Sequence, residues 1–189
     1  MAINLTKGQK IDLTKTNPSV RSFRVGLGWN PNANVGKAFD VDVSAFMLNS
    51  SGKLISDNHF IFYNQLESPN KALIHQGDNK TGQGDGDDET LTIDFSKIEP
   101  ETDSIVFVVT IHDAEANNQN FGQISGSYIR IMDGDTSEEI LKYDLNEDFS
   151  IETAIVFGKL YLKDGEWKFE AVGTGRKDGL QSYVTEYSA

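Results

Sequence analysis

The chain has 189 residues, no cysteine and a formal net charge of −12. This length is enough for a core of useful size, and we expect a single domain over residues 1–189. Without cysteine there is no disulfide, no zinc–thiolate site and no thiol redox chemistry, so a cytoplasmic setting is the default expectation. The acidic charge argues against a nucleic-acid partner, because phosphates are bound by Lys and Arg. No apolar run is long enough for a transmembrane segment or a signal peptide.

Short strands are predicted through the first half of the chain, where apolar residues recur at strand spacing or in short runs. The segments with this pattern are Leu5–Leu13, Phe23–Leu27, Phe39–Leu48, Phe60–Tyr63, Leu73–His75 and Leu91–Phe95. The first of them is expected to be an edge strand with a turn. The sequence Gly26-Leu-Gly-Trp-Asn-Pro is expected to end the second strand, because glycine and proline commonly interrupt strands.

Two carboxylates lie within the third predicted strand, Phe39–Leu48. Asp40 and Asp42 alternate with apolar residues there. Because successive side chains of a strand point to opposite faces, both carboxylates are predicted to project from one face. They could hold one metal ion or two neighbouring ions, although ordinary alternation with polar residues toward solvent explains the same pattern.

The second half of the chain also favours strands. Ile105–Ile111 is almost continuously apolar and β-branched, which is typical of a central strand buried on both faces. Two hairpins are predicted, Tyr128–Met132 with Ile140–Leu145 and Thr153–Leu162 with Glu166–Val172. Leu180, Tyr183, Val184 and Tyr187 recur at helical spacing near the C-terminus. We therefore expect an all-β protein, a two-sheet antiparallel β-sandwich with short peripheral helices that include one at the C-terminus.

The most unusual stretch is Gly77–Glu89, Gly-Asp-Asn-Lys-Thr-Gly-Gln-Gly-Asp-Gly-Asp-Asp-Glu, which holds five carboxylates and four glycines. Crowded carboxylates repel one another unless water or a cation separates them. Calcium takes about six to eight oxygen ligands in flexible geometry, and glycines let backbone carbonyls turn toward it. A calcium site and a solvated acidic loop are equally good explanations of this segment alone. It is not an EF-hand, because Gln83 falls where that motif needs glycine.

Motifs for other chemistries are absent from the sequence. There is no P-loop, no dinucleotide fingerprint and no nucleophile elbow. The histidines His59, His75 and His112 are scattered and form no closely spaced pair for zinc. His112-Asp113 could be half of a catalytic dyad, but no serine or cysteine nucleophile is marked by its context. We expect no catalytic and no organic-cofactor residues.

Several motifs occur together, in this order, in one known family. They are Gly26-Leu-Gly-Trp, Phe39-Asp-Val-Asp-Val-Ser-Ala-Phe, the acidic segment, Thr110-Ile-His-Asp-Ala and Gly165-Glu-Trp-Lys-Phe. Over nearly its whole length the chain resembles the TerD family of tellurium-resistance and general-stress proteins. The resemblance implies a calcium-binding β-sandwich of the bacterial cytosol with a role in resistance to tellurite and other stresses. Asn30 replaces the usual Asp and Lys80 replaces a usual apolar residue, which puts the affinity and the number of ions in question.

The favoured hypothesis is a non-enzymatic stress-response protein that binds one or two Ca²⁺ ions between the Asp-x-Asp strand and the acidic segment. The candidate metal ligands are Asp40, Asp42, Asp78, Asn79, Gly84, Asp85, Asp87, Asp88 and Glu89. One alternative is an acidic adaptor that docks other stress-resistance proteins. Another is an enzyme acting on an oxyanion such as tellurite, which is disfavoured because the acidic field repels anions and no thiol is available for reduction.

Overall fold

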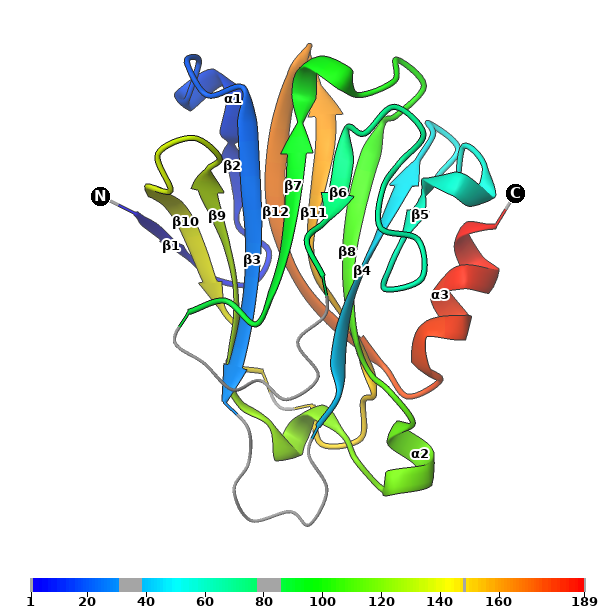
Figure 1. Cartoon of the computed structure of the whole chain (residues 1–189). Coiled ribbons are helices and arrows are strands. Elements are labelled where there is room, and N and C mark those ends of the chain that lie inside the picture. Colours follow the sequence, from blue (N-terminus) through cyan, green and yellow to red (C-terminus); the bar gives the residue numbers. More distant parts are fainter. Residues whose placement is uncertain (1, 31–38, 78–85, 148, 189) are drawn as a thin grey trace.

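Two six-stranded β-sheets pack face to face in the computed structural model, which describes residues 2–30, 39–77, 86–147 and 149–188 (Figure 1). The first sheet has the order β1 (Ile3–Leu5), β10 (Glu139–Asp144), β9 (Ser125–Asp133), β3 (Ser22–Asn30), β7 (Glu89–Asp94) and β6 (Leu73–His75). The second has the order β2 (Lys10–Asp12), β12 (Glu166–Arg176), β11 (Ala154–Lys163), β8 (Ser104–Ile111), β4 (Val41–Leu48) and β5 (Phe60–Ile61). The predicted sandwich is confirmed.

The strand pairing is antiparallel except between β1 and β10, which run parallel at the edge of the first sheet. Among the described residues, three short α-helices accompany the sheets: α1 (Leu13–Thr16), α2 (Ala114–Asn117) and α3 (Gly179–Tyr187). Single 3₁₀ turns occur at Asp57–His59, Phe95–Lys97 and Phe121–Gln123. In the described part of the chain, no helix is long and apolar enough to cross a bilayer.

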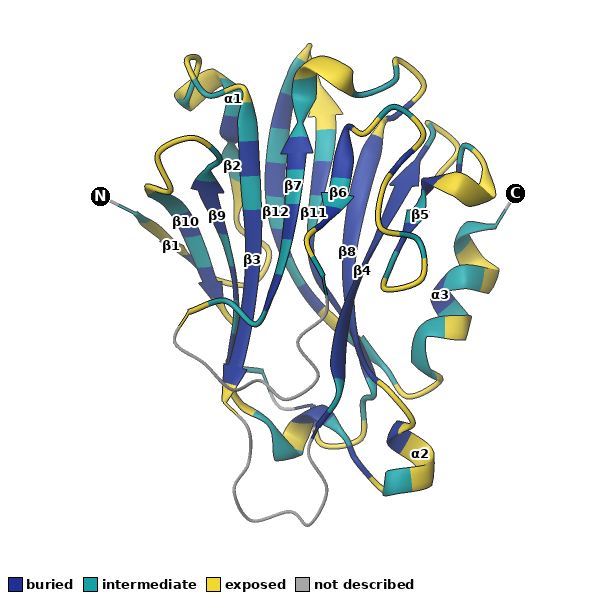
Figure 2. Ribbon diagram, viewed as in Figure 1, coloured by how far each residue is buried: buried dark blue, intermediate teal, exposed yellow. Residues whose placement is uncertain are grey.

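Strand β8 is buried on both faces, as its apolar sequence predicts (Figure 2). Ile105, Phe107 and Val109 belong to the large cluster between the sheets. Val106 and Val108 belong to a second cluster on the outer face of the same sheet, which helix α3 covers. The strand therefore has no solvated face, because a sheet packs against one side and a helix against the other.

Strand β4 is divided between the same two clusters. Val41 and Val43 point into the space between the sheets, whereas Phe46 and Leu48 point outward toward α3. By alternation Asp42 shares the outward face, yet it is only 6% exposed. The outer face of β4 is therefore not a simple solvated surface, because α3 and the neighbouring chain cover it.

Strand β3 continues through its glycines and ends at Asn30, three residues beyond the predicted end at Leu27, so the expectation that these glycines interrupt the strand is wrong. Gly26 lies opposite Thr90 and Gly28 opposite Tyr128 in antiparallel pairings, and the register with β9 shifts only between Gly28 and Asn30. A Cβ atom at Gly26 would lie 2.0 Å from an oxygen of Asp87. The glycines here make room for neighbouring side chains rather than turning the chain.

Helix α3 lies on the second sheet, as the helical spacing of its apolar residues predicts. The fully buried Phe46 ring stacks on Phe60 at 4.5 Å between centroids and lies 5.0 Å from the Tyr187 ring of α3. Phe60 stacks in turn on Phe62 at 4.5 Å. This row of rings joins β4, β5 and α3 on the outer face of the sheet.

Replacing Phe46 by alanine should lower the free energy of unfolding by about 3–5 kcal/mol, because it leaves a cavity under α3. Phe62→Ala is the matched control, since Phe62 belongs to the same row of rings and is only partly buried. It should cost less than about 2 kcal/mol. Urea unfolding followed by circular dichroism measures both, and equal losses would contradict the assignment of Phe46 as the buried anchor of the helix.

Candidate functional site

The candidate ligands that the structure describes all lie at one end of the sandwich, the lower end in Figure 1. There β4 and β7 begin while β3 and β8 end, and β6 runs toward the same end. The described candidates are Asp40, Asp42, Asp87, Asp88 and Glu89. Four further candidates, Asp78, Asn79, Gly84 and Asp85, lie outside the described residues, as does Lys80.

Asp40 precedes β4 and carries a buried oxygen. Its Oδ1 atom is inaccessible to solvent and has no hydrogen-bond partner among the described residues. Its backbone oxygen accepts a hydrogen bond of 2.7 Å from the N–H of His112. The main chain of Asp40 is thus fixed to the end of β8. An uncompensated buried carboxylate oxygen is costly, so this atom is a natural position for a cation.

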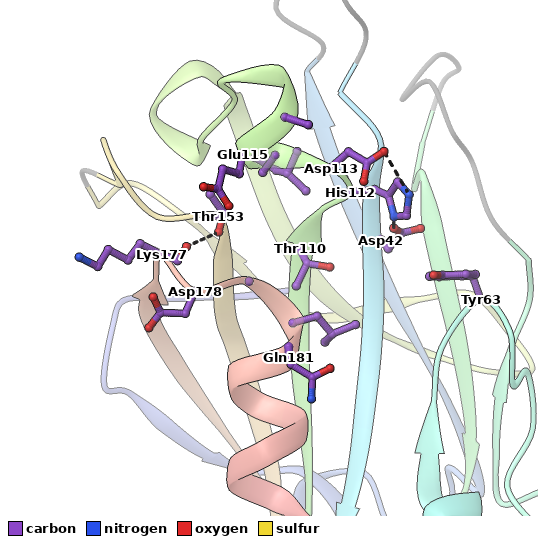
Figure 3. A pocket seen from close by; sticks show the side chains of 15 residues that line it. Asp42, Tyr63, Thr110, His112, Asp113, Glu115, Thr153, Lys177, Asp178 and Gln181 are labelled. Carbon is purple, nitrogen blue, oxygen red and sulfur yellow. Dashed lines mark hydrogen bonds and ion pairs between the residues drawn. The ribbon is translucent and has the colours of Figure 1, made fainter.

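Asp42 forms part of the floor of an open groove on the outer face of the second sheet (Figure 3). Its Oδ2 atom lies 4.0 Å from Nδ1 of His112, and Nε2 of the same ring lies 3.7 Å from Oδ2 of Asp113. The groove has a volume of about 1010 Å³. Besides the phenol of Tyr63, its ionisable lining residues are Asp42, His112, Asp113, Glu115, Lys177 and Asp178. Four carboxylates against one lysine give this groove an acidic field.

Asp87 lies on the outer face of the first sheet, on the other side of the sandwich from Asp42. One of its oxygens, Oδ1, accepts hydrogen bonds of 2.8 Å from Nε of Arg130 and 2.9 Å from the Tyr128 hydroxyl. The Asp87 side chain is 8% exposed. A second nitrogen of Arg130 lies 3.1 Å from a carboxylate oxygen of Glu139. The negative charge of Asp87 is therefore already matched by a guanidinium.

Asp88 is tied to strand β3 by two hydrogen bonds. Its N–H donates to the Leu27 oxygen at 2.8 Å, and its Oδ2 atom accepts from the N–H of Trp29 at 2.9 Å. Burial raises the pKa of the Asp88 carboxyl, although the Trp29 hydrogen bond opposes this shift, and the nearby Asp87 charge raises it further. A cation beside Asp88 would offset this cost by stabilising the ionised form.

Glu89 points into the interior rather than toward solvent, because it shares the inward face of β7 with Leu91 and Ile93. Its Oε2 atom lies 2.9 Å from Nε2 of His75, and both side chains are 1% exposed. The N–H of Gly77 donates to the other ring nitrogen of His75, Nδ1, at 3.2 Å, which helps to fix the orientation of the ring. This pair joins the two strands that flank the acidic segment.

Sequence reasoning missed the His75–Glu89 pair, although a signal for it exists. His75 follows Leu73 at a spacing of two, and Glu89 precedes Leu91 at the same spacing. Both polar residues therefore continue the inward face of their strands. The alternation indicates burial of each residue, but only the pairing of β6 with β7 brings the two together.

The described carboxylates occupy three levels of the molecule. Asp42 is on the outer face of the second sheet, Glu89 is between the sheets, and Asp87 is on the outer face of the first sheet. Among the described residues, no group of three or more His, Asp or Glu side chains is placed to hold a metal ion. A shared ion between Asp40 or Asp42 and the acidic segment stays a prediction, because residues 78–85 lie outside the described part.

Replacing His75 by leucine should lower the free energy of unfolding by about 3–5 kcal/mol, because it leaves the buried Glu89 carboxylate without its histidine. The double variant His75→Leu/Glu89→Leu should recover much of this loss, since an apolar pair replaces both members. Urea unfolding in the presence of a chelator measures both variants. A neutral His75→Leu, or a double variant no more stable than the single one, would contradict the pairing.

The TerD domain family model matches residues 1–187 of the chain. The chain is 54% identical over 188 residues to general stress protein 16U of Bacillus subtilis (strain 168), and this match covers 99% of the chain and 97% of that protein. It is 50% identical over 187 residues to tellurium resistance protein TerD of Serratia marcescens, covering 99% of the chain and 97% of that protein.

A solved structure, that of a homologue of telluride resistance protein (TerD) from Streptomyces coelicolor A3(2), resembles the fold with a TM-score of 0.71. The similarity covers 88% of this chain and 96% of that chain at 18% identity, and it therefore supports the architecture alone. The family match over nearly the whole length and the two bacterial relatives carry the assignment. The chain belongs to the TerD family of tellurium-resistance and general-stress proteins.

Proposed function

We propose that the protein binds calcium at the end of the sandwich that carries Asp40, Asp42 and Asp88, and that it serves the stress response as a calcium-binding protein rather than as an enzyme. The observation that carries this proposal is the Oδ1 atom of Asp40, which is buried and has no hydrogen-bond partner among the described residues. A cation would compensate the burial of that charge. The pKa of the partly buried Asp88 is raised by burial, and a cation beside it would offset this by stabilising the ionised carboxylate.

The chemistry of the candidate ligands fits calcium better than a softer metal. Every candidate ligand is a carboxylate, an amide or a backbone oxygen, and the sequence contains no cysteine. Oxygen ligands select hard cations, and calcium tolerates the irregular geometry that a glycine-rich segment gives. Asp78, Asn79, Gly84 and Asp85 could complete the shell of one or two ions.

Three features favour a binding function over catalysis. No serine or cysteine nucleophile is marked by the sequence context of the His112-Asp113 pair. No cysteine is available to reduce an oxyanion. The net charge of −12 disfavours approach of an anionic substrate. The cysteine-free composition is also consistent with the proposed cytoplasmic setting.

An adaptor function is the second candidate, and the acidic groove favours it. A basic segment of another stress-resistance protein would complement the carboxylates of Asp113, Glu115 and Asp178 around its rim. Calcium would then be incidental to partner docking. The two candidates differ in one observable, because docking through the groove should persist after a chelator removes calcium.

Calcium should stabilise the folded protein by mass action, since the unfolded chain cannot hold the ligands together. At about a hundredfold excess over the dissociation constant, the expected gain is about 2.7 kcal/mol per site. Calorimetric titration of the metal-stripped protein and thermal melting with and without chelator measure this effect. Magnesium is the control and should compete poorly, because it requires octahedral geometry and keeps its waters. No heat at millimolar calcium together with an unchanged melt would refute the proposal.

Asp42→Asn should weaken calcium binding at least about tenfold, or about 1.4 kcal/mol, if the Asp42 carboxylate is a ligand. The metal-free variant should be slightly more stable than the parent, because one repelling charge is removed. Asp103→Asn is the matched control, since Asp103 is exposed and precedes β8 at the other end of the sandwich. It should change both quantities by less than about 0.5 kcal/mol. Unchanged affinity in both Asp42→Asn and Asp40→Asn would exclude the strand from the site.

A further inference from the structure

We infer that Asp87, although it belongs to the acidic segment, is not a metal ligand but the latch that fixes the end of this segment to the first sheet. Tyr128 and Arg130 act as positioning residues for Asp88, and Gly26 and Gly28 provide the space that the latch occupies. The tests below that measure calcium affinity rest on the proposed calcium binding. The contacts of Asp87 and the test in metal-free protein do not depend on it.

The contacts of Asp87 are those of a structural ion pair. Its Oδ1 atom accepts from Nε of Arg130 and from the Tyr128 hydroxyl within 2.9 Å, and the side chain is 8% exposed. Burial raises the pKa of Tyr128, and the Asp87 charge raises it further, so the hydroxyl keeps the proton that it donates. A calcium ion at Asp87 would have to compete with a guanidinium and a phenol that already satisfy this oxygen.

The glycines of β3 are explained by the same latch. A Cβ atom at Gly26 would lie 2.0 Å from Oδ2 of Asp87. A Cβ atom at Gly28 would lie 2.5 Å from the Tyr128 ring. Side chains at these two positions would displace the carboxylate and the phenol from the face of the strand. The Gly-x-Gly spacing therefore lets the Asp87 carboxylate and the Tyr128 ring pack directly against the backbone of β3.

The latch acts on Asp88 because the two residues are adjacent in the chain. Asp87 is held on the outer face of the first sheet, while the Asp88 N–H donates to the Leu27 oxygen and Oδ2 accepts from the Trp29 N–H. The hydrogen bonds made by the Asp87 carboxylate, by the Asp88 N–H and by Asp88 Oδ2 thus fix the orientation of the Asp88 carboxylate before an ion binds. Ordering a chain segment costs roughly 1–2 kcal/mol per residue, and a segment ordered in advance avoids this cost on binding.

Two substitutions of the same residue separate a latch from a ligand. In Asp87→Asn the amide oxygen can still accept from Arg130 and Tyr128, so calcium affinity should change by less than about threefold. In Asp87→Ala both hydrogen bonds are lost, and affinity should fall about tenfold or more. A ligand role predicts that both variants lose affinity to a similar extent, because both lack the carboxylate. Calorimetric titration of the two variants therefore decides between the roles.

Tyr128→Phe supports the assignment without changing any charge. It removes one donor to Asp87 and should lower calcium affinity by about threefold or more, whereas Tyr161→Phe on β11 should leave it unchanged. Equal losses in Asp87→Asn and Asp87→Ala, or no loss in Tyr128→Phe, would overturn the inference.

Hydrogen exchange at the Asp88 amide tests the latch in metal-free protein. Exchange should accelerate in Asp87→Ala and Tyr128→Phe but not in Asp87→Asn, because only the first two variants lose a hydrogen bond of the latch. If the parent protein binds no calcium, the proposed function fails while this measurement still judges the latch. Unchanged exchange in Asp87→Ala would reject the latch whatever the calcium result.

Discussion

Mutual repulsion between carboxylates is the constraint on which this end of the molecule depends. In the described part of the chain, the end of the segment Gly77–Glu89 and the start of β4 bring five acidic side chains to one end of the sandwich, those of Asp40, Asp42, Asp87, Asp88 and Glu89. Charges of one sign at short range destabilise a compact state unless they are separated, paired or neutralised. For the described carboxylates the fold uses separation and pairing: Asp87 has a guanidinium, Glu89 has a buried imidazole, and Asp42 lies on the far face of the other sheet.

This arrangement divides a contiguous acidic sequence into side chains with different physical roles. Alternation along the chain sends Asp87 outward and Glu89 inward, and Asp88 between them is bound to the backbone of β3. Asp87 thus forms an ion pair with Arg130, and Glu89 lies against the buried imidazole of His75, so two of the three acidic residues in Asp87-Asp-Glu hold the start of β7 in place. Among the described acidic residues, Asp40, Asp42 and Asp88 remain as the carboxylates at this end whose charge is not matched by Arg130 or His75, and Asp88 is held by its hydrogen bonds to β3.

Much of the fold is predictable from local patterns, whereas the partners of the acidic residues are not. The hairpin at Asp164-Gly165 is specified locally, because both residues adopt positive φ angles, 56° and 78°, as a tight hairpin turn requires. The double burial of β8 follows from its unbroken apolar run. The path of β3 through Gly26 and Gly28 is not predictable in this way, because the side chains that need the glycines, Asp87 and Tyr128, lie far away in sequence. The same holds for the pairing of His75 with Glu89, which depends on the register of two strands.

The position of β3 in its sheet determines how late its hydrogen bonds can form while the chain is being synthesised. Strand β3 pairs with β7 and β9 rather than with a sequence neighbour, so its hydrogen bonds close loops of many tens of residues. Such long-range closure is entropically slow, and all-β chains of this kind commonly fold in milliseconds to seconds. Since Arg130 follows Asp87 by 43 residues, the contact between them can form only after most of the chain has left the ribosome. In a truncated or partly synthesised chain that lacks Arg130, the Asp87 carboxylate would therefore have no guanidinium partner, and the end of the acidic segment would not be fixed to the first sheet.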